Sequence, residues 1–299
     1  MISSKDVHFY RQHGYLVIED VLSAAELAVL RGVIDAWVEE SRGVGANDEF
    51  FDLEDAHSPD APKVRRFKSP DLHHESFRRL VDHPAIVDAL QRLWATGVRF
   101  SKSKLNMKIA GCGAAVEWHQ DWAFYPHTND DLAAVGFMID DMTPENGAMM
   151  VIPGSHKGPV YSHHAGGTFC GAVDTLAQGI DTSGAKMLTG RAGSVTIHHV
   201  RTLHASAPNR SSAPRRFLLH QYEAADAWPL LGIDDYESFK AGLVRGEEVA
   251  APRMEALPVR LPYPNATHEG SIYENQRTLA RLFFDDAQAP VAAAKEEQA

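Results

Sequence analysis

The alternation of apolar and polar positions divides the chain into a helical first third and a β-rich remainder. Ser3 or Ser4 can cap a short N-terminal helix, after which YLVIEDV at 15–21 predicts a strand. Ser23 and Glu26 then form a capping-box pattern ahead of a longer amphipathic helix. The beginning of the chain is therefore expected to be mainly helical.

Further along, the pattern changes from helical to strand-like. The segment 45–70 is polar and rich in Asp and Pro, which predicts a loop, whereas FRRLVDHPAIVDALQRLW at 77–94 has helical periodicity. From residue 98 onward, short apolar runs alternate with turn residues, and this spacing predicts a double-stranded β-helix, the cupin-like jelly roll, with the N-terminal helices packed outside it. The expected strands lie within residues 98–110, 115–125, 133–142, 148–153, 194–200 and 215–224.

The length of the chain fits one domain, expected over 1–285. It would comprise a mainly helical part, 1–97, and a jelly-roll core, 98–225. The glycine-rich stretch 157–185 has no clear period, and a loop that long in a compact domain is typical of a lid. The last residues, 286–299, have the composition of a disordered tail.

Charge and composition exclude several classes of function. The chain has 29 basic and 40 acidic residues, a net charge of -11, which disfavours binding to nucleic acid or to anionic membranes. It has only two cysteines, Cys112 and Cys170, too few for a disulfide framework, and no apolar run long enough for a signal peptide or a membrane span. A cytoplasmic protein is expected, and the sequence does not indicate its oligomeric state.

His119 and Asp121 form a candidate metal pair. In a strand, side chains two residues apart leave the same face with Cα atoms about 6.5 Å apart, so both can reach one ion. With 16 histidines in the chain, such a pair is expected about once by chance, so the spacing alone does not identify a site. His73 and Glu75 have the same spacing but precede a helical run, where their side chains diverge.

An iron(II) site of this kind needs a third protein ligand, and His204 is the best candidate. It lies in a strand-like run and is followed eleven residues later by Arg215 on the next expected strand. His198 and His199 compete for the same role. Neither has an arginine at a comparable distance together with a serine two residues further on.

Arg215 has the chemistry to bind the far carboxylate of a 2-oxo dicarboxylic acid that chelates the metal. An antiparallel pair of strands joined by the turn PNRSSAP at 208–214 would bring it close to His204. Ser206, on the same face as His204, could add a hydroxyl to that carboxylate. Arg216 would replace Arg215 if the strand register shifted by one residue.

These residues lie in segments that resemble the phytanoyl-CoA dioxygenase family. The resemblance extends from YLVIEDVLSAAEL to Arg216 and is carried by SKLNMK at 103–108, WHQDWAFYP at 118–126, ENGAMMVIPGSHKGP at 145–159 and HASAPNRSSAPR at 204–215. It implies an enzyme that uses iron(II), 2-oxoglutarate and O2 to hydroxylate an unactivated C–H bond of a small-molecule metabolite. 2-Oxoglutarate would be decarboxylated to succinate in the same reaction.

The resemblance also assigns roles to individual residues. His119, Asp121 and His204 match the iron ligands, Arg215 and Ser206 match the residues that bind the 2-oxoglutarate carboxylate, Asn106 matches a further co-substrate contact, and Phe137 matches an aromatic residue lining the same pocket. The carboxylate of Asp121 disfavours halogenation, because related halogenases have a small residue there. Desaturation, epoxidation and cyclisation remain open alternatives, since they do not depend on the ligand set.

The sequence indicates the substrate contacts less clearly than the metal ligands. Trp122, Tyr125, Arg66 and Arg201 are candidates, although aromatic residues here can equally pack the core and the arginines can lie at the surface. One alternative function is a cupin-like metal enzyme that needs no oxo acid, against which Arg215 and Asn106 argue. Another is a non-catalytic binding or sensing protein, which would be expected to have lost a ligand or the arginine.

Overall fold

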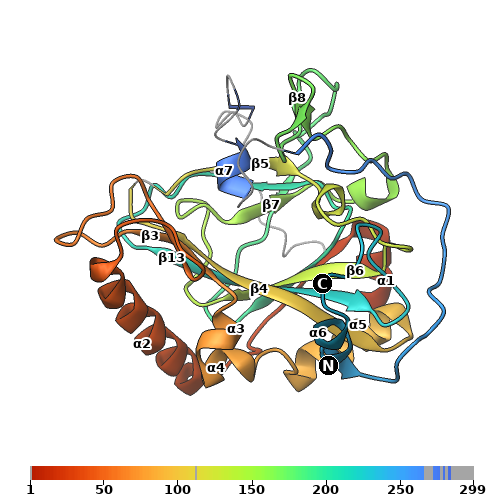
Figure 1. Cartoon of the computed structure of the whole chain (residues 1–299), viewed down its shortest axis with the longest axis horizontal. Coiled ribbons are helices and arrows are strands. Elements are labelled where there is room, and N and C mark those ends of the chain that lie inside the picture. The colour runs from red at the N-terminus through yellow and green to blue at the C-terminus, as the bar shows by residue number, and fades with distance from the viewer. Residues whose placement is uncertain (1, 112, 266–271, 277–278, 280–281, 284–299) are drawn as a thin grey trace.

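The computed structural model describes residues 2–111, 113–265, 272–276, 279 and 282–283, so the tail expected at 286–299 lies outside the described residues. Two antiparallel sheets face each other, with most of the helices on the outer face of the larger one (Figure 1). This arrangement confirms the jelly-roll fold. No helix within the described ranges has the length and apolar character needed to cross a membrane.

The larger, major sheet has the strand order β1-β11-β6-β13-β4-β3-β2, and β14 also pairs with β4. Its strands are β1 (Tyr15–Ile18), β11 (Val195–His199), β6 (Leu132–Met138), β13 (Arg215–Ala224), β4 (Val98–Lys108), β3 (Val64–Lys68), β2 (Phe51–Leu53) and β14 (Leu243–Arg245). The minor sheet has the order β10-β7-β12-β5. It consists of β10 (Lys186–Met187), β7 (Met149–Val151), β12 (His204–Ser206) and β5 (Val116–His119), and a separate hairpin is formed by β8 (His164–Ala165) and β9 (Thr168–Phe169).

Both expected N-terminal helices are present, and each begins with a capping box, Ser3 with Asp6 and Ser23 with Glu26. The single helical run expected over 77–94 is interrupted, because Pro84 has no amide hydrogen to donate and starts a new helix instead. The helices are α1 (Ser4–His13), α2 (Ala24–Glu40), α3 (Pro70–His73), α4 (Glu75–Arg78), α5 (Pro84–Trp94), α6 (Tyr236–Ala241) and α7 (Ile272–Gln276), with 3-10 turns η1 (Ser41–Gly43), η2 (Asp121–Ala123) and η3 (Ser155–Lys157).

The loop expected at 45–70 is wrong in part, because β2 and β3 form a hairpin there that extends the major sheet beyond β4. The charged residues that favoured a loop are paired within this hairpin. Asp52 is buried and forms ion pairs with both Arg66 and Lys68. A composition typical of a solvated loop therefore belongs to a strand pair whose charges neutralise one another.

The outward face of the major sheet forms the main hydrophobic core with α2, α4 and α5. His220 of β13 is fully buried there, with its ring 5.3 Å from that of Phe100 and 5.0 Å from that of Phe137. Burial among these apolar rings lowers the pKa of His220 to about 3, from an ordinary value of 6.5.

This buried imidazole predicts a pH dependence of stability. Between pH 6.5 and about 3, the unfolded chain binds a proton at position 220 that the folded chain does not, so acid favours unfolding across that window. His220→Phe removes this proton-binding site. In the variant, the free energy of unfolding should therefore fall less steeply as the pH is lowered, by up to about 1.4 kcal/mol per pH unit. Urea unfolding of the metal-free protein at pH 7 and pH 5 measures this, and an unchanged pH dependence in the variant would contradict the assignment.

Candidate active site

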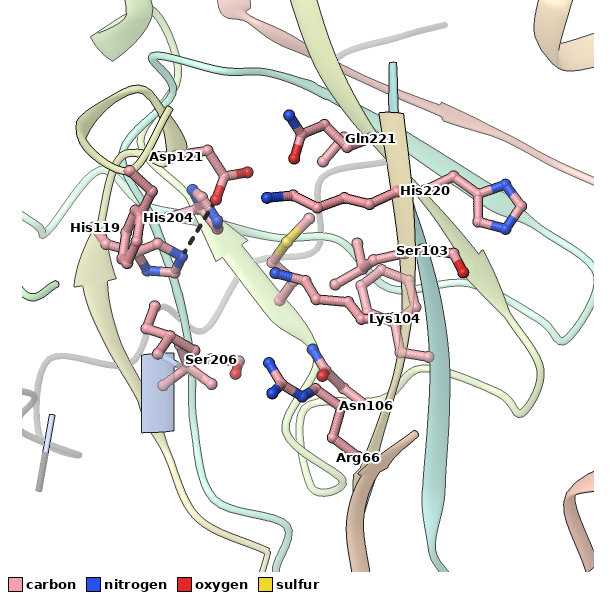
Figure 2. A pocket seen from close by; sticks show the side chains of 18 of the residues that line it. Arg66, Ser103, Lys104, Asn106, His119, Asp121, His204, Ser206, His220 and Gln221 are labelled. Carbon is pink, nitrogen blue, oxygen red and sulfur yellow. Dashed lines mark ion pairs between the residues drawn. The ribbon is translucent and has the colours of Figure 1, made fainter. Parts of the chain in front are cut away.

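A cavity of about 440 Å³ opens between the two sheets and is lined by side chains from both (Figure 2). The minor sheet contributes residues of β5 and β12, and the major sheet contributes residues of β3, β4 and β13. The site therefore depends on the sheets facing each other, because neither sheet alone surrounds the space.

His119, Asp121 and His204 converge on one side of this cavity. His119 is the last residue of β5 and His204 the first of β12, and antiparallel pairing places the two directly opposite each other. Their rings are 4.0 Å apart between centroids, and potential ligand atoms of all three residues lie within 4.8 Å of one another. Two imidazoles and one carboxylate in this arrangement form the facial set of ligands that suits iron(II) and leaves other positions open.

The two-residue spacing predicted that His119 and Asp121 lie on one face of a strand, but Asp121 lies beyond the end of the strand. The strand ends at His119, and Asp121 is the first residue of the 3-10 turn η2. The turn places the Asp121 carboxylate beside His119, with Oδ1 3.9 Å from Nε2 of the imidazole. The next residue, Trp122, is carried into the core, where its indole nitrogen donates to the Pro258 carbonyl at 2.9 Å.

Backbone carbonyls orient both imidazoles. Nδ1 of His119 lies 2.7 Å from the Glu117 carbonyl oxygen, and Nδ1 of His204 lies 2.9 Å from that of Thr202. Because a carbonyl can only accept, each Nδ1 carries the hydrogen and each Nε2 is left with a free lone pair. The fold thus selects the tautomer that a metal ligand needs.

The protonation states also suit a cation. Burial lowers the pKa of His119 to about 4 and that of His204 well below its ordinary value, so both are neutral at pH 7. Burial alone would raise the pKa of Asp121, but His198, His204 and Lys104 around it outweigh burial and hold that pKa well below 3.8. The carboxylate is therefore ionised, which is the form that binds metal.

The competing histidines lie outside this ligand group. His198 lines the cavity with Nε2 3.6 Å from Asp121, whereas His199 faces Asp130 on the other side of β11, with Nε2 3.8 Å from that carboxylate. Among the described residues, only His119, Asp121 and His204 form a group of metal-ligating side chains.

Arg215 lies at the start of β13, in the sheet opposite His204. The expected hairpin between their strands is wrong, because β12 pairs with β5 and β7, whereas β13 pairs with β4 and β6. The two residues instead line one cavity from opposite sheets. Arg216, the alternative, points away from the cavity and forms ion pairs with Asp140 and Asp35.

The polar groups around Arg215 fit a carboxylate ligand. Its guanidinium is buried and donates to the Gly147 carbonyl at 3.2 Å, but its Nε hydrogen has no partner in the part of the chain described. Burial lowers the pKa of Arg215 to about 10, which still leaves it charged at pH 7. Ser206 and Asn106 also line the cavity, and a Ser hydroxyl or an Asn amide nitrogen can donate to a carboxylate. A buried charge with an unused donor is the pattern expected where a carboxylate completes the hydrogen bonding.

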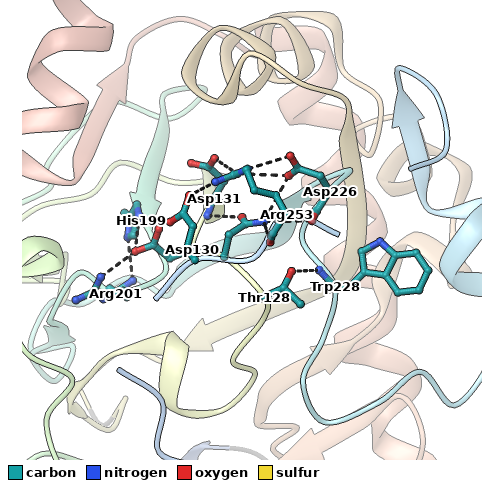
Figure 3. Close-up of polar contacts among 10 residues, drawn as sticks. Thr128, Asp130, Asp131, His199, Arg201, Asp226, Trp228 and Arg253 are labelled. Atoms are coloured by element: carbon teal, nitrogen blue, oxygen red, sulfur yellow. Dashed lines mark hydrogen bonds and ion pairs between the residues drawn. The ribbon is translucent and has the colours of Figure 1, made fainter. Parts of the chain in front are cut away.

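Some of the remaining predicted site residues line the cavity, and the others are buried elsewhere. Tyr125 and Arg66 line the cavity, but Phe137, Trp122 and Arg201 do not. Phe137 and Trp122 are fully buried in the main core. Arg201 is buried in a separate polar cluster, where it binds the Asp130 carboxylate and the Gly158 carbonyl beside the Arg253 ion pairs (Figure 3).

Sequence reasoning missed Lys102, Lys104 and Tyr273, all of which line the cavity. The two lysines could have been found, because they alternate with Asn106 along β4 and such residues share one face of a strand. Tyr273, in contrast, comes from the short helix α7 near the end of the chain, where the sequence has no comparable signal.

Comparison with known proteins places this fold and site in a family. The family model described as phytanoyl-CoA dioxygenase matches residues 10–217. A probable alpha-ketoglutarate-dependent hypophosphite dioxygenase from Stutzerimonas stutzeri is 40% identical over 279 residues, covering 92% of this chain and 97% of the relative. L-proline trans-4-hydroxylase from Streptomyces griseoviridis is 32% identical over 240 residues, covering 74% of this chain and 86% of the relative. The crystal structure of EctD from S. alaskensis with 2-oxoglutarate and 5-hydroxyectoine has a TM-score of 0.62 and 25% identity, covering 87% of this chain and 89% of that one.

The chain therefore belongs to the phytanoyl-CoA dioxygenase family, as the resemblance of its motifs indicated. It is an iron- and 2-oxoglutarate-dependent dioxygenase with a His-Asp-His site.

Substitutions at the two ends of the site should separate metal binding from co-substrate binding. His204→Ala should weaken iron(II) binding, whereas Arg215→Met should leave iron binding intact and weaken 2-oxoglutarate binding by about 10- to 100-fold, the range for a lost charge-assisted contact. Anaerobic titration of the visible band formed by iron(II) with 2-oxoglutarate measures both. Arg216→Met is the matched control, since its side chain faces Asp140, and equal losses in the two arginine variants would contradict the assignment.

Proposed function

We propose that this protein hydroxylates an unactivated bond of a small-molecule substrate and converts 2-oxoglutarate to succinate and carbon dioxide in the same reaction. The observation that carries the proposal is the facing arrangement of the His119, Asp121 and His204 group and the buried Arg215 across one cavity. Oxygen activation belongs to iron(II) and 2-oxoglutarate when they are bound. The chain's residues position these groups and the substrate relative to one another.

Within this proposal, each residue of the site has one task. His119, Asp121 and His204 would hold the metal from the minor sheet, and Asp121 would fill the coordination position that a halide needs in halogenases. Arg215 and Ser206 would bind the far carboxylate of 2-oxoglutarate. The co-substrate would then span the space between the two sheets, with its oxo acid end at the metal.

The first substrate to test is hypophosphite, because a relative with that named substrate aligns with nearly the whole chain. Hydroxylation would convert one P–H bond to P–OH and give phosphite, with one oxygen atom of O2 in the product and the other in succinate. A cavity of about 440 Å³ accommodates 2-oxoglutarate together with a small substrate.

We also propose that the chain forms a single oxygenase domain in which residues 157–185, none of which lines the cavity in this structure, form a lid anchored beside the metal ligands. Three contacts support this arrangement. The backbone N–H of Gln120 donates to Nε2 of His163 at 2.8 Å, and the backbone N–H of Val173 donates to the Trp118 carbonyl at 2.7 Å. Phe169 packs on Phe124 with ring centroids 5.0 Å apart. The segment is thus attached to residues next to the metal ligands.

Substrate-dependent succinate formation tests the proposed function. Iron-loaded protein with 2-oxoglutarate and O2 should form succinate several times faster with hypophosphite than without a substrate, and phosphorus NMR should detect phosphite in equal amount. L-Proline serves as the comparison substrate, and chelator-treated protein as the control. Iron binding without any effect of 2-oxoglutarate would contradict the proposal and favour a cupin-like enzyme that needs no oxo acid.

A further inference from the structure

The cavity is strongly basic, although the chain as a whole has a net charge of -11. Among the described residues that line it, the one carboxylate is Asp121, a proposed metal ligand. The cationic residues lining it are Arg66, Lys68, Lys102, Lys104 and Arg215. Such an excess of positive charge in a partly enclosed space favours the binding of anions.

Three of these cations already have an assigned partner. Arg66 and Lys68 form ion pairs with the buried Asp52, the second with its Nζ 3.0 Å from the carboxylate. Arg215 is assigned to the far carboxylate of 2-oxoglutarate. The positive charges left in the cavity are those of Lys102 and Lys104.

These two lysines face the cavity from β4 and make few polar contacts. Lys104 has no hydrogen bond or ion pair with any described residue, and Figure 2 shows its side chain extending from β4 toward the metal group. The ammonium of Lys102 lies 4.7 Å from the centre of the Tyr125 ring, a cation–π contact. Lys102 is exposed, whereas Lys104 is half-buried, and burial lowers the pKa of Lys104. The charge of Lys104 also lowers the pKa of Lys102. A bound anion would relieve both effects.

Strand register separates the lysines from the carboxylate end of the co-substrate site. Arg215 pairs with Lys108, Phe217 with Asn106, and Leu219 with Lys104, so the β4 position opposite Arg215 is four residues from Lys104. At about 3.3 Å per residue, this is roughly 13 Å along the strand, and Lys102 lies further still. The far carboxylate of 2-oxoglutarate at Arg215 would therefore leave both lysines available to another ligand.

We infer that Lys102 and Lys104 bind the substrate, and that this substrate is a small oxyanion that carries no positive group. The inference rests on the proposed function and assigns its substrate class. A zwitterion such as an amino acid would also need a carboxylate for its ammonium group, and Asp121 is the only one lining the described cavity. An oxyanion held between the two lysines would lie on the wall of the cavity that faces the metal group.

The test uses the iron(II)–2-oxoglutarate band of the anaerobic protein, first without and then with hypophosphite. Formation of the band reports co-substrate binding, and its change on titration reports anion binding beside it. Lys102→Met and Lys104→Met should each raise the hypophosphite concentration at half-maximal change by about 10- to 100-fold. Affinity for 2-oxoglutarate should remain within about threefold. Lys104→Arg keeps the charge and should stay within about fivefold of the parent protein. Lys5→Met, on the exposed face of α1, is the matched control.

Three results would overturn the inference, and each is distinct from failure of the proposed function. Methionine variants that respond to hypophosphite like the parent protein would show that the lysines do not bind substrate. Methionine variants that lose the band itself would assign the lysines to the co-substrate. If the parent protein forms the band but neither hypophosphite, phosphite nor methylphosphonate alters it, the oxyanion class is wrong. Absence of the band in the parent protein would instead refute the proposed function.

Discussion

The pairing of β5 with β12 is the constraint on which the site depends. Opposite residues of antiparallel strands lie about 5 Å apart, so the register that places His204 against His119 also brings two imidazoles to one point. The turn η2 then adds the Asp121 carboxylate from the same strand end. A shift of one residue in this pairing would turn one imidazole to the other face of the sheet and leave no metal group.

The second requirement is that the major sheet lies opposite this group at a fixed distance. Arg215 of that sheet is buried, and its Nε hydrogen has no partner within the described structure. Unpaired buried polar groups destabilise a fold, so their presence at the cavity wall is explained by a ligand that satisfies them. In the proposed arrangement the minor sheet holds the metal, whereas the far carboxylate of the co-substrate lies between Arg215 of the major sheet and Ser206 of the minor sheet. The jelly roll holds the two sheets in register.

Several parts of this picture were predictable from the sequence, and others were not. The short strands and the capping boxes at Ser3 and Ser23 follow from local patterns, and the family motifs indicated the residues that meet at the site. The hairpin of β2 and β3 was missed because charge pairing around Asp52 is a tertiary effect. Phe137, Trp122 and Arg201 are close to site residues in sequence, but their side chains point into the core or into another polar cluster, and a linear pattern does not specify this direction.

We propose that the metal on the minor sheet and the far carboxylate of 2-oxoglutarate, bound by Arg215 of the major sheet and Ser206 of the minor sheet, share one cavity. An anaerobic crystal structure with iron(II) and 2-oxoglutarate tests it most directly. We expect iron bound by His119, Asp121 and His204, with the far carboxylate of 2-oxoglutarate on Arg215 and Ser206. Iron bound at another site, or the far carboxylate on Lys104 with Arg215 empty, would contradict it.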